Sequence, residues 1–179
     1  MSLFLDLSLM REARERIERT IPPSVFDAEG EAYRVESPVH LAFDIHKDGK
    51  QFHLVGGVKA ALRLSCGRCL EDYTFPVDAP FDVLYLPHSA NAGEGEVEVE
   101  DEDLTTAYYR DEQIDLAQLV REQFYLAIPM KPLCQEGCRG LCVHCGTNLN
   151  SGSCNCAQEW TDPRLESLRS LLDRRDGKV

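Results

Sequence analysis

The sequence lacks long apolar runs and any recognisable export signal. No stretch of its 179 residues approaches the roughly 18 consecutive apolar residues that a membrane-spanning helix requires. The opening "MSLFLDLSLMREARER" has no positive charge before its apolar part and no small-residue cleavage site after it. We therefore expect a cytoplasmic protein with no membrane partner. Stable disulfides are rare in that compartment.

Basic residues are also scarce, with 19 Lys and Arg against 31 Asp and Glu and a formal net charge of −12. Residues 94–122 hold eleven acids and two bases, so this segment carries −9 of the total. Such a chain is not a polycation suited to nonspecific nucleic-acid binding, although a local basic face is compatible with it. The candidates for such a face, which could equally be solvated and interspersed with acids, are Arg11, Arg14, Arg16, Arg19, Arg164, Arg169, Arg174, Arg175 and Lys178.

Residues 35–86 carry the alternating apolar pattern of antiparallel strands. The runs "VHLAFDIH", "FHLVGGVKAALRLS" and "YTFPVDAPFDVLYLP" are separated by the turn signal "KDGK" and by "CGRC". Gly56 and Gly57 predict a bulge or a sharp bend, and Pro76 and Pro80 predict that the third run is an edge strand or a broken strand. Near the amino end, the alternating leucines of "LFLDLSL" predict a strand, and "REARERIERT" predicts a short charged helix.

Helical periodicity follows the acidic segment "HSANAGEGEVEVEDED", which is expected to be a loop. Asp115 is the predicted N-cap of a helix that ends before Pro129. Its buried face is predicted to hold Leu116, Leu119, Val120 and Phe124. A second short helix is predicted from "DPRLESLRSLL", with Asp162 as its N-cap.

These elements predict an α+β protein: a twisted antiparallel β-sheet, or a partly closed barrel, with a packed helix and a C-terminal zinc-binding module. We expect an α+β domain over residues 1–130, with the acidic loop at 88–103. The cysteine-rich metal-binding tail and the terminal helix then occupy residues 131–179.

The cysteines are the most informative residues of the chain. Six of the eight lie between Pro132 and Cys156, and the fragment "CVHCG" has the form of a zinc knuckle. Two intervening residues let both sulfurs bind one ion, and the following glycine permits a positive φ. The candidate metal ligands are Cys134, Cys138, Cys142, Cys145, Cys154 and Cys156. The spacing leaves open which four share an ion, with Cys142 and Cys145 the firmest pair.

Structural zinc is favoured because it holds clustered thiolates unreactive and supplies free energy for folding a tail with few apolar residues. Disulfides, an iron–sulfur cluster on the Cys-x3-Cys-x2-Cys spacing of Cys138, Cys142 and Cys145, and thiol redox chemistry are the alternatives. Cys66 and Cys69, in "CGRC", are predicted to lie in a hairpin turn. They would form a second metal half-site or a thiol pair. We expect His144 to be exposed and not to bind metal.

The combination of "LSCGRCLEDYTFPV", "IDLAQLVREQFYLAIPMKPLC", "CRGLCVHCGTNLNSGSCNC" and "DPRLESLRSLL" resembles the YceD family of bacterial proteins. That family is described as large ribosomal RNA subunit accumulation proteins. The resemblance covers most of the chain after residue 35, and the motifs occur in the same order. It implies a cytoplasmic, non-enzymatic ribosome-biogenesis factor with a structural Zn²⁺ that supports accumulation or processing of 23S rRNA.

The partners implied are precursor large-subunit rRNA or a 50S assembly intermediate, and a basic ribosomal protein that would meet the acids at 94–103. Arg68, between Cys66 and Cys69, and Arg139 are the candidate contacts to RNA or to a protein partner. Two other functions remain open at this point: a thiol–disulfide redox protein that uses Cys66 and Cys69, and a protein-interaction module that acts through the acidic loop.

Overall fold

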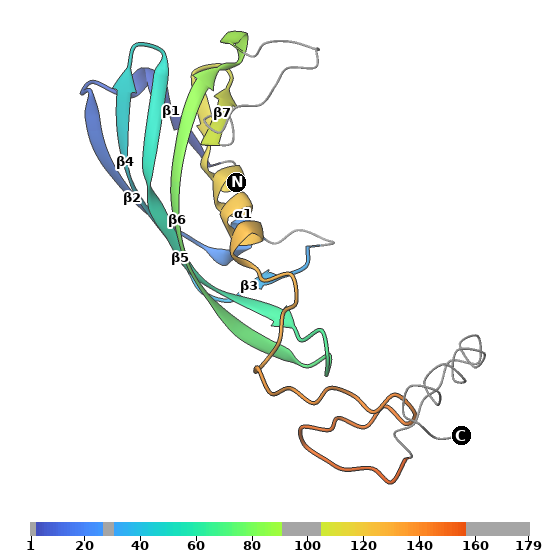
Figure 1. Ribbon diagram of the computed structural model, residues 1–179. Coiled ribbons are helices and arrows are strands. Elements are labelled where there is room, and N and C mark those ends of the chain that lie inside the picture. The colour runs from blue at the N-terminus through green and yellow to red at the C-terminus, as the bar shows by residue number, and fades with distance from the viewer. Residues whose placement is uncertain (1–2, 27–30, 91–104, 157–179) are drawn as a thin grey trace, which may run out of the picture.

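The computed structural model describes residues 3–26, 31–90 and 105–156, and in these ranges the protein is mostly β-sheet with one α-helix (Figure 1). The main sheet has six strands in the order β2-β4-β5-β6-β7, and β3 also pairs with β5. Its strands are β2 (Arg14–Ile21), β3 (Arg34–Val35), β4 (Val39–Asp48), β5 (Gln51–Ser65), β6 (Asp72–Pro87) and β7 (Thr106–Tyr109). All pairings are antiparallel except that between β6 and β7, which is parallel and departs from the expected antiparallel sheet.

A small second sheet pairs β1 (Phe4–Asp6) with β8 (Gln113–Asp115), and α1 (Leu116–Ala127) follows directly. Three short 3-10 helices, η1 (Leu7–Leu9), η2 (Pro23–Val25) and η3 (His88–Ala90), lie in connections. The leucine alternation at the amino end therefore yields a strand of three residues, because Asp6 caps η1 through a hydrogen bond from the Ser8 N–H.

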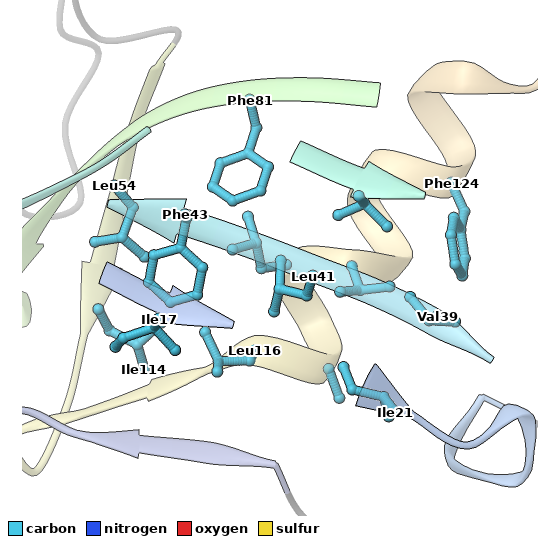
Figure 2. Close-up of a cluster of buried hydrophobic side chains, with 14 of the residues drawn as sticks. Ile17, Ile21, Val39, Leu41, Phe43, Leu54, Phe81, Ile114, Leu116 and Phe124 are labelled. Atoms are coloured by element: carbon cyan, nitrogen blue, oxygen red, sulfur yellow. The ribbon is translucent and has the colours of Figure 1, made fainter. Parts of the chain in front are cut away.

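The core lies between the concave face of the main sheet and α1 (Figures 1 and 2). Alternate residues of β4 are fully buried, as in Leu41, Phe43 and Ile45, while their neighbours face solvent. The predicted helix is confirmed: the Asp115 carboxylate accepts hydrogen bonds from the backbone N–H groups of residues 117 and 118. The four predicted core residues of the helix, Leu116, Leu119, Val120 and Phe124, are at most 2% exposed.

The main sheet is open, so the partly closed barrel was the wrong alternative. In the described ranges β2 and β7 form its two ends and do not pair with each other. Closing the sheet would require these ends to meet. Instead α1 lies in the concavity of the sheet (Figure 1). Its buried side chains join the core there, so the sheet does not need to close on itself to bury its concave face.

The predicted helix at "REARERIERT" is also wrong, since residues 14–21 of that region form β2. The segment contains good helix formers, but Ile17 and Ile21 are the only residues of β2 that become buried. These two positions share a face in either conformation, so the sequence pattern does not discriminate between them. The edge of β4 supplies a complete ladder of backbone partners, and this tertiary interaction outweighs local helix propensity.

The β5–β6 hairpin is long and curved, and it carries its turn well away from the core (Figure 1). Its register runs without interruption through Gly56 and Gly57, so of the two predicted alternatives, a bulge or a sharp bend, the bulge is absent. Gly56 instead permits a close approach of strands: a Cβ built on it would lie 2.2 Å from the carbonyl oxygen of Ala42. Residues 91–104, which include most of the predicted acidic loop, and the predicted terminal helix lie outside the described residues.

Adjacent glycines of β5 provide a matched test of this packing. We expect Gly56→Ala to destabilise the protein by about 1–3 kcal/mol, because backbone atoms would have to move to admit the methyl group. Gly57→Ala should change the free energy of unfolding by less than about 0.5 kcal/mol, since its Cβ would meet its nearest neighbour at 3.4 Å. Urea unfolding of both variants checks this, and equal effects would contradict it.

Candidate metal centres

The eight cysteines are all free thiols, and they gather into two groups of four. The hairpin site consists of Cys66, Cys69, Cys134 and Cys138, and the tail site consists of Cys142, Cys145, Cys154 and Cys156. Within each group the four sulfur atoms lie within 4.8 Å of one another. Each group therefore offers four sulfur ligands to one ion.

The sulfur separations fit a mononuclear tetrahedral site. In the hairpin site Sγ of Cys66 lies 3.7 Å from Sγ of Cys138, and Sγ of Cys69 lies 3.7 Å from Sγ of Cys134. Four thiolates about 2.3 Å from a central ion would be spaced by about 3.8 Å. A disulfide requires about 2.05 Å between sulfurs. Ligands to different irons of a cluster lie farther apart than one ion's ligands, so a single ion suits both groups better than a cluster.

Backbone hydrogen bonds hold the tail against the β5–β6 turn to form the hairpin site. The turn is closed by the Cys66 N–H, which donates to the carbonyl of Glu71 at 2.9 Å. The Gly67 N–H donates to the carbonyl of Pro132 at 2.8 Å, and the Leu141 N–H donates to the carbonyl of Arg68 at 3.2 Å. The segment after α1 is thereby fixed to the turn on both sides of its two cysteines.

The two Cys-x2-Cys motifs have the same turn geometry. The N–H of the residue after the second cysteine donates to the carbonyl of the first, from Leu70 to Cys66 at 3.0 Å and from Gly146 to Cys142 at 2.9 Å. Leu70 has φ of 61° and Gly146 has φ of 73°. Glycine adopts this left-handed conformation freely, whereas a leucine there is uncommon and strained. "CGRCL" is therefore a second knuckle whose terminal glycine is replaced.

Burial distinguishes the two sites. Cys66, Cys69 and Cys138 are at most 3% exposed and pack with Tyr73, Leu133 and Leu141. In the tail site Cys145 is exposed, and Cys154 and Cys156 are partly buried. The hairpin site thus has three buried cysteines, with Cys134 partly buried, whereas Cys142 is the one buried cysteine of the tail site.

Hydrogen bonds to sulfur favour ionisation of some thiols of the hairpin site. The backbone N–H of Cys69 is the main cause that lowers the pKa of Cys66 to about 6. The side-chain amide of Asn150 donates to Sγ of Cys138 at 3.3 Å and lowers the pKa of that thiol. Burial, followed by hydrogen bonds with neighbouring sulfurs, raises the pKa of Cys134 to about 12. Thiolate formation at all four positions therefore needs a compensating cation.

The tail site repeats this pattern. Hydrogen bonding to the Thr147 hydroxyl, 3.1 Å from Sγ of Cys145, lowers the pKa of Cys145 to about 6. The neighbouring Cys145 sulfur is the main cause that raises the pKa of Cys156 to about 12. Both groups thus contain thiols prepared for ionisation beside thiols that ionise only when a positive charge is present.

The donor sets fit closed four-coordinate sites. Four sulfurs around one ion leave no open coordination position for substrate or water, and a tetrahedral S₄ set suits Zn²⁺ or iron. Redox exchange at Cys66 and Cys69 is disfavoured, because an attacking thiolate must reach a substrate disulfide and both side chains are buried. The pair also lies in a strand-to-strand turn, as the sequence predicted.

The structure resolves the grouping that the spacing left open. The sequence offers the six cysteines between Pro132 and Cys156 as candidate ligands without dividing them. In the structure Cys134 and Cys138 lie with Cys66 and Cys69. A signal for this grouping was present, because "CGRC" and the Cys-x3-Cys pair are each half of a four-sulfur set. His144 is exposed, as expected.

The two candidate arginines lie together at the hairpin site. Nη1 of Arg68 donates to the carbonyl of Cys138 at 2.8 Å, so this side chain also supports the local fold. Arg139 is the next residue, and its backbone N–H donates to the Asn150 side chain while the side chain remains exposed. The acids at 94–103 lie outside the described residues.

Comparison with known proteins places these features in a family. The family model described as "Large ribosomal RNA subunit accumulation protein YceD" matches residues 54–172, which include both cysteine sites. This chain belongs to the YceD family. No solved structure is significantly similar to the chain. None of the helices in the described ranges combines the length and the apolar composition that a membrane crossing needs.

Several relatives extend the comparison beyond the YceD family model. A chloroplastic protein of Arabidopsis thaliana, named "Large ribosomal RNA subunit accumulation protein YCED homolog 1", is 26% identical over 79% of this chain and 51% of its own length. The uncharacterized protein YlbN of Bacillus subtilis is 27% identical over 78% of this chain and 77% of its own length. An uncharacterized Mycobacterium tuberculosis protein is 35% identical over 66% of this chain and 55% of its own length. The chain spans about half the length of the chloroplastic relatives it matches.

Metal content should follow this grouping. We expect protein purified without added metal to contain two equivalents of metal per chain, one in each four-sulfur group. Cys134→Ser and Cys154→Ser should each lower the content to one equivalent, because each removes one ligand from a different site. Elemental analysis measures this. A content of one in the wild type, or a Cys134→Ser variant that keeps two, would contradict the grouping.

Chelator accessibility should differ between the sites. Because three of the four hairpin cysteines are buried and only one of the four tail cysteines is, we expect a chromogenic chelator to remove metal in two phases of one equivalent each. The fast phase should be absent from Cys154→Ser, and the slow phase should be absent from Cys134→Ser. Loss of the slow phase in Cys154→Ser would reverse the assignment.

Proposed function

We propose that this chain is a non-enzymatic ribosome-biogenesis factor that supports accumulation or processing of 23S rRNA. It would bind precursor large-subunit rRNA or an assembly intermediate of the 50S subunit. The observation that carries the proposal is the family match over residues 54–172, together with relatives named for large-subunit rRNA accumulation. The cytoplasm is the proposed compartment, since eight unpaired cysteines suit a reducing environment.

Both cysteine groups would hold structural Zn²⁺. Zinc has no redox chemistry, takes four sulfur ligands in tetrahedral geometry, and keeps all four thiols ionised. At the hairpin site the ion would join the β5–β6 turn to the segment after α1. That joint would position the tail, which has few apolar residues to organise it, relative to the sheet.

The contact with RNA would lie at the hairpin site, on Arg68 and Arg139. Arginine binds phosphate with two parallel hydrogen bonds, because its planar guanidinium presents the donors in a fixed geometry. The single hydrogen bond from Arg68 to Cys138 leaves further N–H groups of that side chain for a ligand. A contact confined to this end is compatible with a net charge of −12, because the acids cluster elsewhere in the sequence.

The acids at 94–103 are the proposed contact for a basic ribosomal protein. This second contact and the arginine contact would act on the same particle, one on protein and one on RNA. The pure protein-interaction module remains the alternative function, in which the acidic loop alone would carry binding.

Binding to ribosomal particles tests the proposal. The metal-loaded chain should co-sediment with large-subunit precursors, and Arg68→Ala with Arg139→Ala should weaken this by about tenfold and reduce its salt dependence. Arg34→Ala with Lys50→Ala is the matched control, because it removes the same charge from exposed positions that are not candidate RNA contacts.

In cells whose own copy is deleted, we expect less mature 23S rRNA and restoration by the wild-type chain. Restoration that needs residues 94–103 but not the two arginines would favour the interaction module. Failure of the wild-type chain to sediment with any ribosomal particle would reject the proposed function. A Cys66→Ser variant that retains normal rRNA but loses disulfide reductase activity would favour the redox alternative.

A further inference from the structure

The strand β2 has an open edge. It pairs with β4 over residues 14–21 on one side, and no strand in the described ranges pairs with its other side. The strand has no proline and no break in register along its eight residues. An unpaired edge of this kind offers a row of backbone N–H and C=O groups to another strand.

The ladder fixes which residues of β2 present these groups. The Lys47 N–H donates to the carbonyl of Ala13 at 2.9 Å, so odd-numbered residues of this strand direct their backbone groups toward β4. Successive residues of a strand point in opposite directions within the sheet. The free N–H and C=O groups at the edge are therefore those of the even-numbered residues Arg14, Arg16, Glu18 and Thr20.

The exposed edge of β6 differs from that of β2 because it contains prolines. β7 covers only Leu84–Pro87 of β6, which leaves residues 72–83 without a second neighbour in the described part of the chain. Pro76 and Pro80 lie in that stretch and have no N–H to offer an incoming strand. Two prolines thus remove backbone donors from this edge, whereas β2 has no proline and carries charged side chains of both signs.

Charges along β2 are self-complementary. When the segment "ERIER", residues 15–19, is placed antiparallel to a copy of itself about Ile17, each charged side chain faces one of opposite sign. In that register Arg16 faces Glu18 of the second copy, and Glu15 faces Arg19 of the second copy. The two-fold axis passes between the Ile17 residues, so four pairs of opposite charge form across the junction.

Neighbouring registers have fewer pairs of opposite charge: an axis through residue 16 keeps two, between Arg14 and Glu18, and an axis through residue 18 keeps none within β2. Even-numbered residues carry the free backbone groups, so they must face even-numbered residues of the second copy. The two-fold axis can therefore pass only through a residue, and the next possible registers have their axes at residues 16 and 18. An axis through residue 16 opposes Arg16 to itself, and an axis through residue 18 opposes Glu18 to itself. Like charges directly opposite are unfavourable, so the Ile17 register is selected.

We propose that β2 pairs antiparallel with β2 of a second copy of this chain, about a two-fold axis at Ile17. The pairing joins two six-stranded sheets into one continuous sheet. The even-numbered residues contribute the backbone hydrogen bonds, and the side chains of residues 15–19 determine the register. Intrachain contacts of Arg16 with Glu18 and Asp44 are exposed and can rearrange toward the second copy.

Charge reversal tests the pairing in the full-length, metal-loaded chain by sedimentation velocity over a wide concentration range. The wild type should show a concentration-dependent dimer. Arg16→Glu or Glu18→Arg alone should weaken the dimer by at least about tenfold, because each creates two pairs of like charge. An equal mixture of the two variants should restore association as a heterodimer, and the double variant should restore the homodimer.

Restoration by mixing also demonstrates that both single variants are folded. Glu18→Pro should abolish the dimer, because it removes an edge N–H, while leaving the β2–β4 ladder intact. Arg11→Glu is the matched control outside the strand and should dimerise as the wild type does. A wild type that stays monomeric up to several hundred micromolar would overturn the proposal, and so would a dimer that the two single variants leave unchanged.

Discussion

Contact among four sulfur atoms of the hairpin site determines how the carboxyl-terminal part of the described chain is placed. The pairs Cys66–Cys138 and Cys69–Cys134 join residues that are 72 and 65 positions apart. Closing a loop of that length has an entropic cost that few apolar contacts in the tail could offset. An ion bound by all four thiolates would supply the missing free energy, and the knuckle at residues 66–70 and the segment after α1 would then depend on each other.

The curved sheet separates this site from the main core. α1 covers the concave face, and the β5–β6 hairpin extends beyond it to carry Cys66 and Cys69 at its turn (Figure 1). A second small core forms there around Cys66, Cys69 and Cys138, with Leu133 and Leu141 packed against it. In the proposed function this arrangement would serve a large partner, with the buried thiols as supports and exposed groups such as Arg139 as contacts.

The edges of the sheet reflect two different treatments of unpaired backbone. Prolines at 76 and 80 remove backbone N–H donors from β6. β2 has no proline, so it keeps all of its backbone N–H donors, and its side chains carry charges of both signs. The same charges explain why "REARERIERT" was misread as a helix: surface positions of an edge strand and of a helix are both rich in charge, and two isoleucines four residues apart fit either. Only the presence of β4 as a neighbour distinguishes the two conformations.

Local sequence by itself determined the features that depend on near neighbours. The alternation in residues 35–86, the hairpin turn at Cys66 and Cys69, the helix capped by Asp115 and the knuckle at Cys142 and Cys145 were all read from spacing. Tertiary structure alone decided the parallel β6–β7 pairing, the open sheet and the assignment of Cys134 and Cys138 to the distant turn. The physical reason is that these features join segments far apart in the chain, and their free energy depends on partners that spacing does not identify.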